Sequence, residues 1–266
     1  MCVYNGELYL KKSINSILHQ TFNDFEFIII NDGSNDSSMQ IIDSFNDHRI
    51  KIINQLNIGL TKSLNKGIKV SKGTYIARID ADEIATPTRF YKQVTILEKY
   101  NEIGVIGSYC IDFYNIGFNQ LKTISLPKSN HEIRSAMIKN NPFVHGSVMM
   151  RKKAIEEVGY YNESFKYVQD YELWGRISKL YKFQNLPIVL LKRIVTIKSI
   201  TYNPSVMKER ALFALKAQIS VLKNLNAPLY SYIHLWRRIL RFMLYDMGII
   251  SFPIKSKKDL LKTIFG

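Results

Sequence analysis

Apolar runs and amphipathic stretches alternate along the first third of the chain. Continuous apolar segments at 25–30, 50–53 and 75–79 have the composition of strands buried in a sheet. The stretches between them, beginning with 7–20, carry apolar residues at helical spacing. This alternation of strand and helix predicts an α/β fold with a Rossmann-like, doubly wound and mostly parallel sheet.

The first six residues are expected to form the end of a β-strand and the turn that follows it, without the beginning of the strand. We expect Met1 to be internal to a longer reading frame that supplies the rest of this truncated first strand. After Val206 two helices follow with no strand between them, so we expect one domain over residues 1–200 and a helical extension over 201–266. The elements expected in between begin with a helix at 87–100, a strand at 105–114, irregular chain at 115–130 and a helix at 132–139. A loop entering a strand at 143–150, a helix from Gln169 and a strand at 188–197 are expected to follow.

Carboxylates stand where these strands end. Asp32 follows the first apolar run, and Asp80 and Asp82 follow the third. Ligands bind at the carboxyl ends of strands in open α/β sheets. Two carboxylates this close repel each other, so they usually share a cation or shift a pKa. The same residues also suit a plain acidic turn, in which Glu83 would be solvated.

The net charge narrows the class of partner. The 266 residues include 37 Lys and Arg against 22 Asp and Glu, which gives a net charge of +15 and implies an anionic partner. The two cysteines have no metal-binding or disulfide spacing, so a reducing, cytoplasmic compartment is expected. The sequence shows neither an apolar run of membrane-spanning length nor a signal peptide.

The carboxyl-terminal region carries a concentrated part of this charge. One helix face is expected to hold His234, Arg237, Arg238 and Arg241, with the apolar residues elsewhere, and the tail adds Lys255, Lys257, Lys258 and Lys262. Such a basic amphipathic helix predicts peripheral binding to the anionic inner face of the cytoplasmic membrane. Alternatively, the apolar side packs on the domain and the arginines face water. The charges do not interleave with aromatic sheet positions, which argues against nucleic acid.

Several motifs then stand in one order along residues 1 to about 195. Together they resemble the family 2 glycosyltransferases, the inverting group with the GT-A fold, and they are Val3-Tyr4-Asn5-Gly6, Asn31-Asp32-Gly33-Ser34, Asn57-Ile58-Gly59, Asp80-Ala81-Asp82 and Gln169-Asp170-Tyr171-Glu172-Leu173-Trp174. The resemblance implies hexosyl or N-acetylhexosaminyl transfer from a nucleotide sugar, first of all a UDP-sugar. It also implies a glycan or lipid-linked acceptor in bacterial surface polysaccharide synthesis, and a divalent metal, Mg²⁺ or Mn²⁺.

The resemblance also assigns roles to single residues. It implies nucleotide-sugar contacts for Tyr4, Asp32, Asn57 and Asp80, metal binding for Asp82, a catalytic base in Asp170, and a place on the acceptor side for the loop of His145. These residue types suit the chemistry, because a metal held by carboxylate neutralises a leaving diphosphate and a carboxylate can take the acceptor's proton. A single displacement inverts the anomeric centre. Trp174 is expected in the core.

One departure and two alternatives remain at this point. The family often has His two residues after the arginine that matches Arg193, whereas this chain has Val195, so fewer protein ligands would hold the metal. The Asp80-Ala81-Asp82 segment also superficially suits a phosphatase of the haloacid dehalogenase type, although that motif normally follows the first strand. A non-catalytic, basic membrane-binding module is the other alternative, and its binding would survive the loss of Asp82 and Asp170.

Overall fold

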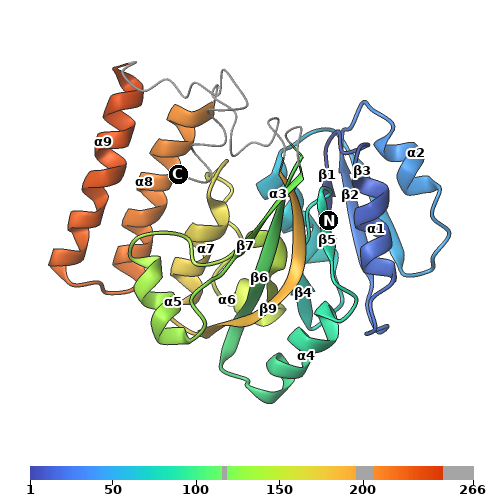
Figure 1. Cartoon of the computed structure of the whole chain (residues 1–266), viewed down its shortest axis with the longest axis horizontal. Helices are drawn as coiled ribbons and strands as arrows, with labels where there is room; N and C mark the ends of the chain where they lie inside the picture. The colour runs from blue at the N-terminus through green and yellow to red at the C-terminus, as the bar shows by residue number, and fades with distance from the viewer. Residues whose placement is uncertain (116–118, 196–205, 248–266) are drawn as a thin grey trace.

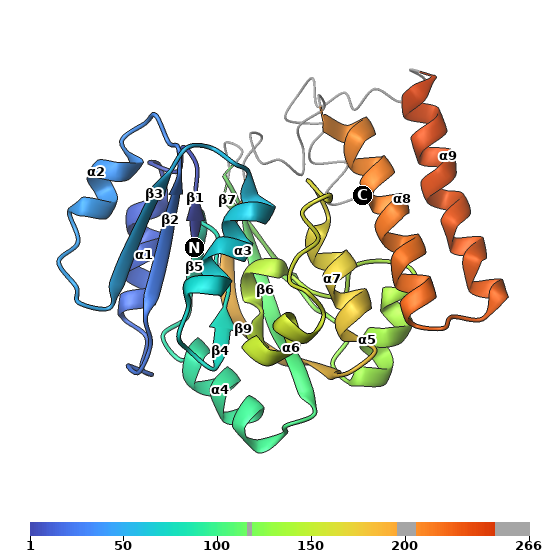
Figure 2. The same cartoon turned by 180° about the vertical axis from the view of Figure 1, so that it is seen from behind.

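The computed structural model describes residues 1–115, 119–195 and 206–247, and it contains two sheets (Figure 1). The first sheet is fully parallel, with the order β1-β2-β3. Its strands are β1 (Cys2–Val3), β2 (Phe27–Asp32) and β3 (Ile50–Gln55), and the connecting helices are α1 (Leu10–Leu18), α2 (Ser38–Asp43) and α3 (Leu60–Val70). Helices α1 and α3 lie on opposite faces of this sheet, as the two opposed views show (Figures 1 and 2). The doubly wound arrangement predicted from the alternating pattern is therefore confirmed here.

The second sheet is mixed, which the alternating pattern did not predict. Its order is β4-β8-β6-β9-β5, with β7 paired to β6. Only β6 and β9 pair in parallel, and every other pair in this sheet is antiparallel. The strands are β4 (Tyr75–Ala77), β5 (Glu83–Ala85), β6 (Ile103–Asn115), β7 (Asn119–Ile124), β8 (Met149–Arg151) and β9 (Lys182–Val195). Strand β7 corrects the expectation of irregular chain over 115–130, because it forms an edge hairpin with β6.

The remaining helices are distributed around the second sheet and at one end of the molecule. They are α4 (Arg89–Lys99), α5 (Asn130–Met137), α6 (Lys152–Glu157), α7 (Gln169–Ile177), α8 (Met207–Asn224) and α9 (Leu235–Asp246), with short 3-10 turns η1 (His145–Ser147) and η4 (Leu229–His234). Figures 1 and 2 place α8 and α9 beside α7, at the end of the molecule away from α1 and α2. None of the helices in the described ranges is long and apolar enough to cross a membrane.

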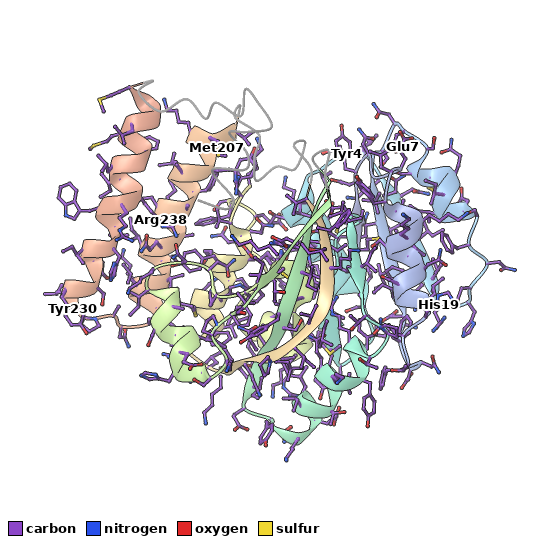
Figure 3. All side chains as sticks on the ribbon, in the orientation of Figure 1. Tyr4, Glu7, His19, Met207, Tyr230 and Arg238 are labelled. Carbon is purple, nitrogen blue, oxygen red and sulfur yellow. The ribbon has the colours of Figure 1, made fainter. Side chains whose placement is uncertain are left out.

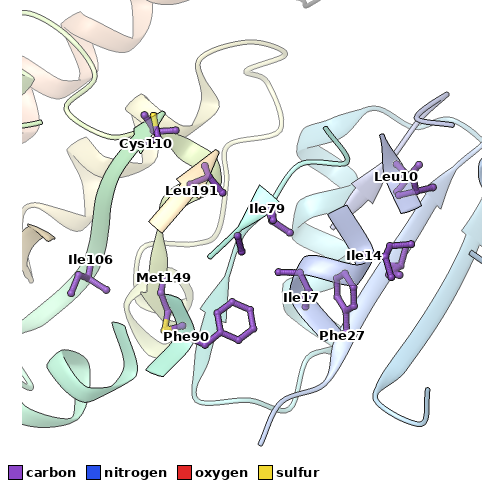
Figure 4. Packing of buried hydrophobic residues seen from close by; sticks show 14 of the residues in the cluster. Leu10, Ile14, Ile17, Phe27, Ile79, Phe90, Ile106, Cys110, Met149 and Leu191 are labelled. Atoms are coloured by element: carbon purple, nitrogen blue, oxygen red, sulfur yellow. The ribbon is translucent and has the colours of Figure 1, made fainter. Parts of the chain in front are cut away.

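Two apolar clusters hold these layers together. The helical spacing of Leu10, Ile14 and Ile17 buries one face of α1 in a cluster with Phe27 of β2 (Figure 4). Ile29 of β2 belongs to the same buried cluster. The second cluster extends from β6 and β9 of the second sheet to α7 and α8. It contains Trp174, which is fully buried as the sequence predicted, together with Ala217 and Val221 of α8. Helix α8 thus shares a core with α7. Gly175 permits this close packing, since a Cβ there would meet Val221 at 3.0 Å.

A cavity of about 790 Å³ separates the two sheets between β2 and β4. Its lining includes Phe27 and Ile28 of β2 and Tyr75 and Ile76 of β4. The amino group of Met1 lies at this cavity, where it donates to the carbonyl of Ile28 at 2.9 Å, and burial lowers its pKa. Strand β4 pairs only with β8 among the described strands, so its other edge faces the cavity side.

Helix α9 is oriented differently from either expectation. Arg238 points inward, because its Nε donates to Gln218 Oε1 of α8 at 2.6 Å and its Nη2 to the Lys139 carbonyl at 3.2 Å (Figure 3). Five apolar side chains are instead at least half exposed, and we call them the α9 apolar stripe: Ile233, Trp236, Leu240, Met243 and Met247. The prediction that Arg238 shares one outward-facing basic face with the other basic residues of the helix is therefore wrong. Lys255, Lys257, Lys258 and Lys262 lie outside the described residues.

Candidate functional site

Three turns meet at the carboxyl ends of the parallel strands β1 and β2, and the third of these turns follows β4 of the second sheet. The Asn5 amide donates to Ser34 Oγ at 3.0 Å, and Asn5 Oδ1 accepts from the Asn35 amide at 2.9 Å, so the turn after β1 is tied to the turn after β2. Gly6 packs against Ala81, since a Cβ at Gly6 would lie 3.2 Å from the Ala81 Cβ. The turn after β1 therefore also touches the Asp80–Asp82 turn. Tyr4 stands over this edge with 56% of its surface exposed, where a ligand can reach it (Figure 3).

Asp32 ends β2 and anchors the turn that precedes α3. Its Oδ1 accepts from Gln55 Nε2 at 2.7 Å and the Ile58 amide at 3.0 Å, and its Oδ2 accepts from the Gly59 amide at 3.0 Å. Burial raises the pKa of Asp32, but these hydrogen bonds outweigh it and hold the pKa below its usual value. Asn57 itself is exposed, and its backbone nitrogen lies 2.7 Å from where a Gly33 Cβ would stand. The carboxylate thus shapes the turn that presents Asn57.

Arg78 is buried beneath the Asp80–Asp82 turn and organises it. Its guanidinium pairs with Asp80 and lies 3.7 Å from Glu83 Oε2. Glu83 Oε2 also accepts the Asp80 backbone N–H at 2.9 Å, and Glu83 is only 4% exposed. The expectation that Glu83 is solvated is therefore wrong. Burial raises the pKa of Glu83 to about 7, with Asp80 adding to the rise and Arg78 opposing it.

The two aspartates of this turn differ in environment. Asp80 is paired to Arg78 and its side chain is 36% exposed, whereas Asp82 has no such partner recorded in the described residues. Burial, and after it the charge of Asp80, raises the pKa of Asp82 to about 6. An anionic Asp82 is thus under electrostatic strain that a cation would relieve. This pair is a place where added positive charge is favourable.

The same pair passes a test of fit for a divalent metal, with one restriction. The described residues contain no group of three or more His, Cys, Asp or Glu side chains that could hold a metal. Arg193, which lies near Val195, is engaged in a bidentate ion pair with Asp112 at 2.7 and 2.8 Å. Mg²⁺ is commonly bound by one or two carboxylates together with substrate phosphates. Asp80 and Asp82 fit that kind of site, in which the ligand supplies the remaining oxygens.

Asp170 lies in the first turn of α7 and is held from a different element. Its Oδ2 accepts a hydrogen bond of 2.6 Å from Asn141 Nδ2, which comes from the loop between α5 and η1. Burial raises the pKa of Asp170, against the lowering effects of the Tyr171 amide, Asn141 and Arg78. The preceding Val168 has a left-handed backbone at φ 58°, which a β-branched residue rarely adopts. A constrained backbone therefore precedes this half-buried carboxyl.

His145 faces inward from the same loop. Its Nε2 is 2.7 Å from the Tyr161 hydroxyl, and its ring packs against the edge of Trp174 at 6.1 Å between centroids. Burial, and then the Arg78 charge, lowers the pKa of His145 well below its usual value, so the ring is neutral. Burial likewise raises the pKa of Tyr161. His145 is thus a hydrogen-bonded loop histidine, and Tyr161 is its partner.

One buried charge connects these parts. The guanidinium of Arg78 influences the pKa of a set of groups from four segments, namely Asp82, Glu83, His145, Tyr161 and Asp170. The structure therefore brings the Asp80–Asp82 turn, the His145 loop and Asp170 around a common centre. Asp32 and Asn57 lie farther along the edge, at the ends of β2 and β3.

Comparison with known proteins identifies the family. Residues 1–159 match the model of Glycosyl transferase family 2. The chain belongs to this family. It is 38% identical over 204 residues to an uncharacterized glycosyltransferase of Haemophilus influenzae, which covers 72% of this chain and 63% of that protein. It is 33% identical over 196 residues to the amylovoran biosynthesis glycosyltransferase AmsE of Erwinia amylovora, with 71% of this chain and 73% of that protein covered.

Solved structures support the fold assignment. TarS of S. aureus in complex with UDP-GlcNAc has a TM-score of 0.66 at 17% identity, covering 91% of this chain and 70% of that one. The mannosyltransferase PcManGT of Pyrobaculum calidifontis, in complex with GDP-Man and Mn²⁺, has a TM-score of 0.66 at 15% identity, covering 98% and 77%. The fold is GT-A, as the resemblance predicted. Family membership leaves no support for the haloacid dehalogenase alternative.

Some functional candidates were missed in the sequence. Arg78 and Glu83 flank the acidic motif, and a lone arginine inside an apolar run was the available signal for the first of them. Asn141 and Tyr161 carried no local signal, because they become relevant only through contacts with residues 29 and 16 positions away. Asp112 is recognisable only through its register with Arg193 across β6 and β9.

Proposed function

We propose that this glycosyltransferase moves a hexosyl or N-acetylhexosaminyl group from a nucleotide sugar to a hydroxyl acceptor with inversion. The observation that carries the proposal is the grouping of two kinds of carboxyl around Arg78. Asp80 and Asp82 favour added positive charge, and Asp170 is a half-buried carboxyl from a separate helix. A leaving diphosphate and an attacking hydroxyl need these two environments on opposite sides of the sugar.

The donor is proposed to bind along the edge from β3 to the Asp80–Asp82 turn. Tyr4 is exposed there for contact with the base, and Asp32 and Asn57 lie beside it on the two neighbouring strand ends. Asp80 stands between this edge and the buried centre, in reach of a ribose or phosphate. A UDP-sugar is the first donor to test, and GDP-mannose is the second, since structures with this fold bind UDP-GlcNAc and GDP-Man.

A Mg²⁺ or Mn²⁺ ion is proposed to be held by Asp82, with Asp80 beside it. When bound, such an ion neutralises the charge that develops on the diphosphate as it leaves. Asp82 suits this position because burial, and after it the charge of Asp80, disfavours its ionisation without a cation. Arg193 stays in its ion pair with Asp112, and Val195 offers no ligand atom, so phosphate and water oxygens are proposed to complete the shell.

Asp170 is proposed as the general base. A base near neutral pH works best with a pKa raised toward the working pH, and burial shifts Asp170 in that direction. The carboxylate accepts the acceptor hydroxyl proton while the oxygen attacks the anomeric carbon. The His145 loop forms the acceptor side through its neutral ring and Tyr161, without taking part in proton transfer.

The acceptor is proposed to be a glycan or lipid-linked intermediate of bacterial surface polysaccharide synthesis, at the cytoplasmic face of the membrane. Support for this setting comes from the relative AmsE, whose name assigns it to amylovoran biosynthesis. Residues 1–200 would then be the catalytic domain and residues 201–266 the segment that binds the membrane. Helix α8 of this segment also packs in the apolar cluster that contains Trp174 of α7.

The α9 apolar stripe is proposed as the surface that meets the anionic membrane. Trp236 is 66% exposed, and the adjacent Arg237 is also exposed, so apolar insertion and attraction to anionic headgroups act on one side of the helix. Co-sedimentation with phosphatidylglycerol vesicles tests this assignment. Trp236→Ser with Leu240→Ser should release the protein, whereas Leu56→Ser, at a still more exposed leucine just after β3, should not. Equal retention of both variants would contradict the membrane role.

A product assay tests the enzymatic proposal. The chain is incubated with UDP-glucose, UDP-galactose, UDP-GlcNAc or GDP-mannose, with Mg²⁺ or Mn²⁺ and membrane lipid extract, and nucleoside diphosphate release is measured. One donor should be consumed in a metal-dependent reaction that Asp170→Asn slows by about 10²–10⁴-fold, the range for losing a general base. Turnover that is unaffected by this substitution would contradict the assignment of the base.

A further inference from the structure

We propose that Asn141 is a positioning residue that fixes the orientation of the Asp170 carboxylate toward the acceptor side. The inference rests on the proposed function of Asp170 as the base, and it adds a residue that neither the family motifs nor the charge pattern point to. Its basis is one hydrogen bond between two chain segments that enclose the site.

The orientation of the Asn141 amide follows from its two partners. Its Oδ1 accepts the Phe143 backbone N–H at 3.2 Å, and only the oxygen of an amide can accept. The nitrogen must therefore face the other way, where Nδ2 lies 2.6 Å from Asp170 Oδ2. Both ends of the side chain are used, and the carboxylate receives a donor rather than a second acceptor.

The bond joins the acceptor-side loop to the first turn of α7. Asn141 belongs to the loop that continues through Phe143 to His145, whereas Asp170 follows the left-handed Val168. A helix-terminal carboxyl with free rotation would sample several rotamers. The Asn141 donor selects one of them, and it does so from the segment that is proposed to line the acceptor.

The electrostatic effect has a definite sign. Burial raises the pKa of Asp170, and the Tyr171 amide, Asn141 and the charge of Arg78 lower it. The pKa of Tyr161, from the segment before α7, is raised first by burial and also by the charge of Asp170. Removal of the Asn141 donor therefore moves the pKa of Asp170 further upward. A hydrogen bond to a charged group corresponds to at least a tenfold change, or about one pH unit.

A purely structural role for Asn141 is the competing explanation, and the chain offers a matched control. Asn185 Nδ2 donates to the carbonyls of Pro127 and Pro142, so it supports the same loop one residue further along. Asn185 is fully buried and has no recorded hydrogen bond to Asp170. Asn185→Ala should therefore destabilise the loop without changing the titration of Asp170.

The first experiment needs no substrate. Stability to urea is measured from pH 4 to 8 for the wild type and Asp170→Asn, and for the same pair carrying Asn141→Ala or Asn185→Ala. A carboxyl with a raised folded-state pKa loses stability as pH rises from its unfolded to its folded pKa. The loss of stability that depends on Asp170 is the difference between the two members of each pair. In the Asn141→Ala pair this loss should be complete at a pH about one unit higher than in the wild-type pair. The Asn185→Ala pair should end where the wild-type pair does.

The second readout separates this inference from the proposed function. In the nucleoside diphosphate assay, Asn141→Ala should move the acid limb of kcat upward by about one pH unit while leaving KM for the donor unchanged. Asn141→Asp, which places a second carboxyl against the first, should move it further. Identical stability profiles for the Asn141→Ala and wild-type pairs would overturn the role of Asn141. Full activity of Asp170→Asn would instead overturn the base, whatever the titration shows.

Discussion

Gly146→Ala is a sharp test of how the Asp80–Asp82 turn is supported. Glu83 packs directly on Gly146, since a Cβ at this glycine would lie 1.7 Å from Glu83 Oε2 and 2.2 Å from its Cδ. Ordinary van der Waals contact begins near 3.4 Å. The carboxylate would have to move by about 1.7 Å, the difference between these distances, and it would then lose the 2.9 Å hydrogen bond from the Asp80 amide.

The cost can be worked from two contributions. Overpacking a closed site typically costs about 1–3 kcal/mol, and losing a hydrogen bond to a charged group costs about 1.5–3 kcal/mol. We therefore expect Gly146→Ala to lower the free energy of unfolding by about 2.5–6 kcal/mol, measured by urea denaturation. Because the Asp80–Asp82 turn moves with Glu83, metal-dependent donor binding should weaken as well.

Gly73→Ala is the matched control for this variant. A Cβ at Gly73 would meet its nearest neighbour, the Tyr75 carbonyl oxygen, at an ordinary 3.4 Å, so the expected change is within about 0.5 kcal/mol. Combining Gly146→Ala with Glu83→Ala should cost less than the sum of the single changes, because the clash is removed. If Gly146→Ala is as stable as Gly73→Ala, the packing of Glu83 has been misread.

Three further predictions concern the site and the sheet. Asp82→Asn should weaken metal-dependent donor binding and turnover together while the fold stays intact, and unchanged metal dependence would contradict the metal role. Asp170→Asn should leave donor affinity, measured by calorimetry, nearly unchanged, and an equal loss of binding would indicate a nucleotide or structural role. Adding an apolar strand upstream of Met1 should raise the melting temperature by filling the cavity between β2 and β4, and no rise would refute this use of the cavity.

The elements whose burial repeats along the sequence were predictable. Strand β2 is recognisable from its apolar run and helix α1 from the helical spacing of its apolar residues. Both patterns are clear because the apolar residues of each element are buried in the same cluster. The acidic strand ends were recognisable because Asp32, Asp80 and Asp82 directly follow apolar runs. Parallel pairing accounts only for Asp32, at the end of β2. Asp80 and Asp82 follow β4, which is antiparallel to β8 in the second sheet, and the contact of Ala81 with Gly6 places their turn beside the turn after β1.

Features that depend on distant partners were not predictable in the same way. Glu83 looks solvated beside two aspartates, and its burial follows from Arg78 and from Gly146, which lies 63 positions away. A helical wheel divides α9 into two faces without saying which one meets α8. The hydrogen bond from Arg238 to Gln218 decides that question, and it turns the apolar stripe outward.

The central claim is that the strand-end carboxylates bind a sugar nucleotide with a metal, while Asp170 acts only in transfer. The most direct test is the shift in melting temperature caused by UDP-GlcNAc, UDP-glucose or GDP-mannose, with and without Mn²⁺, in the wild type, Asp82→Asn and Asp170→Asn. We predict a Mn²⁺-dependent rise with one donor in the wild type and in Asp170→Asn, and its loss in Asp82→Asn. A rise that persists in Asp82→Asn and disappears in Asp170→Asn would contradict the account.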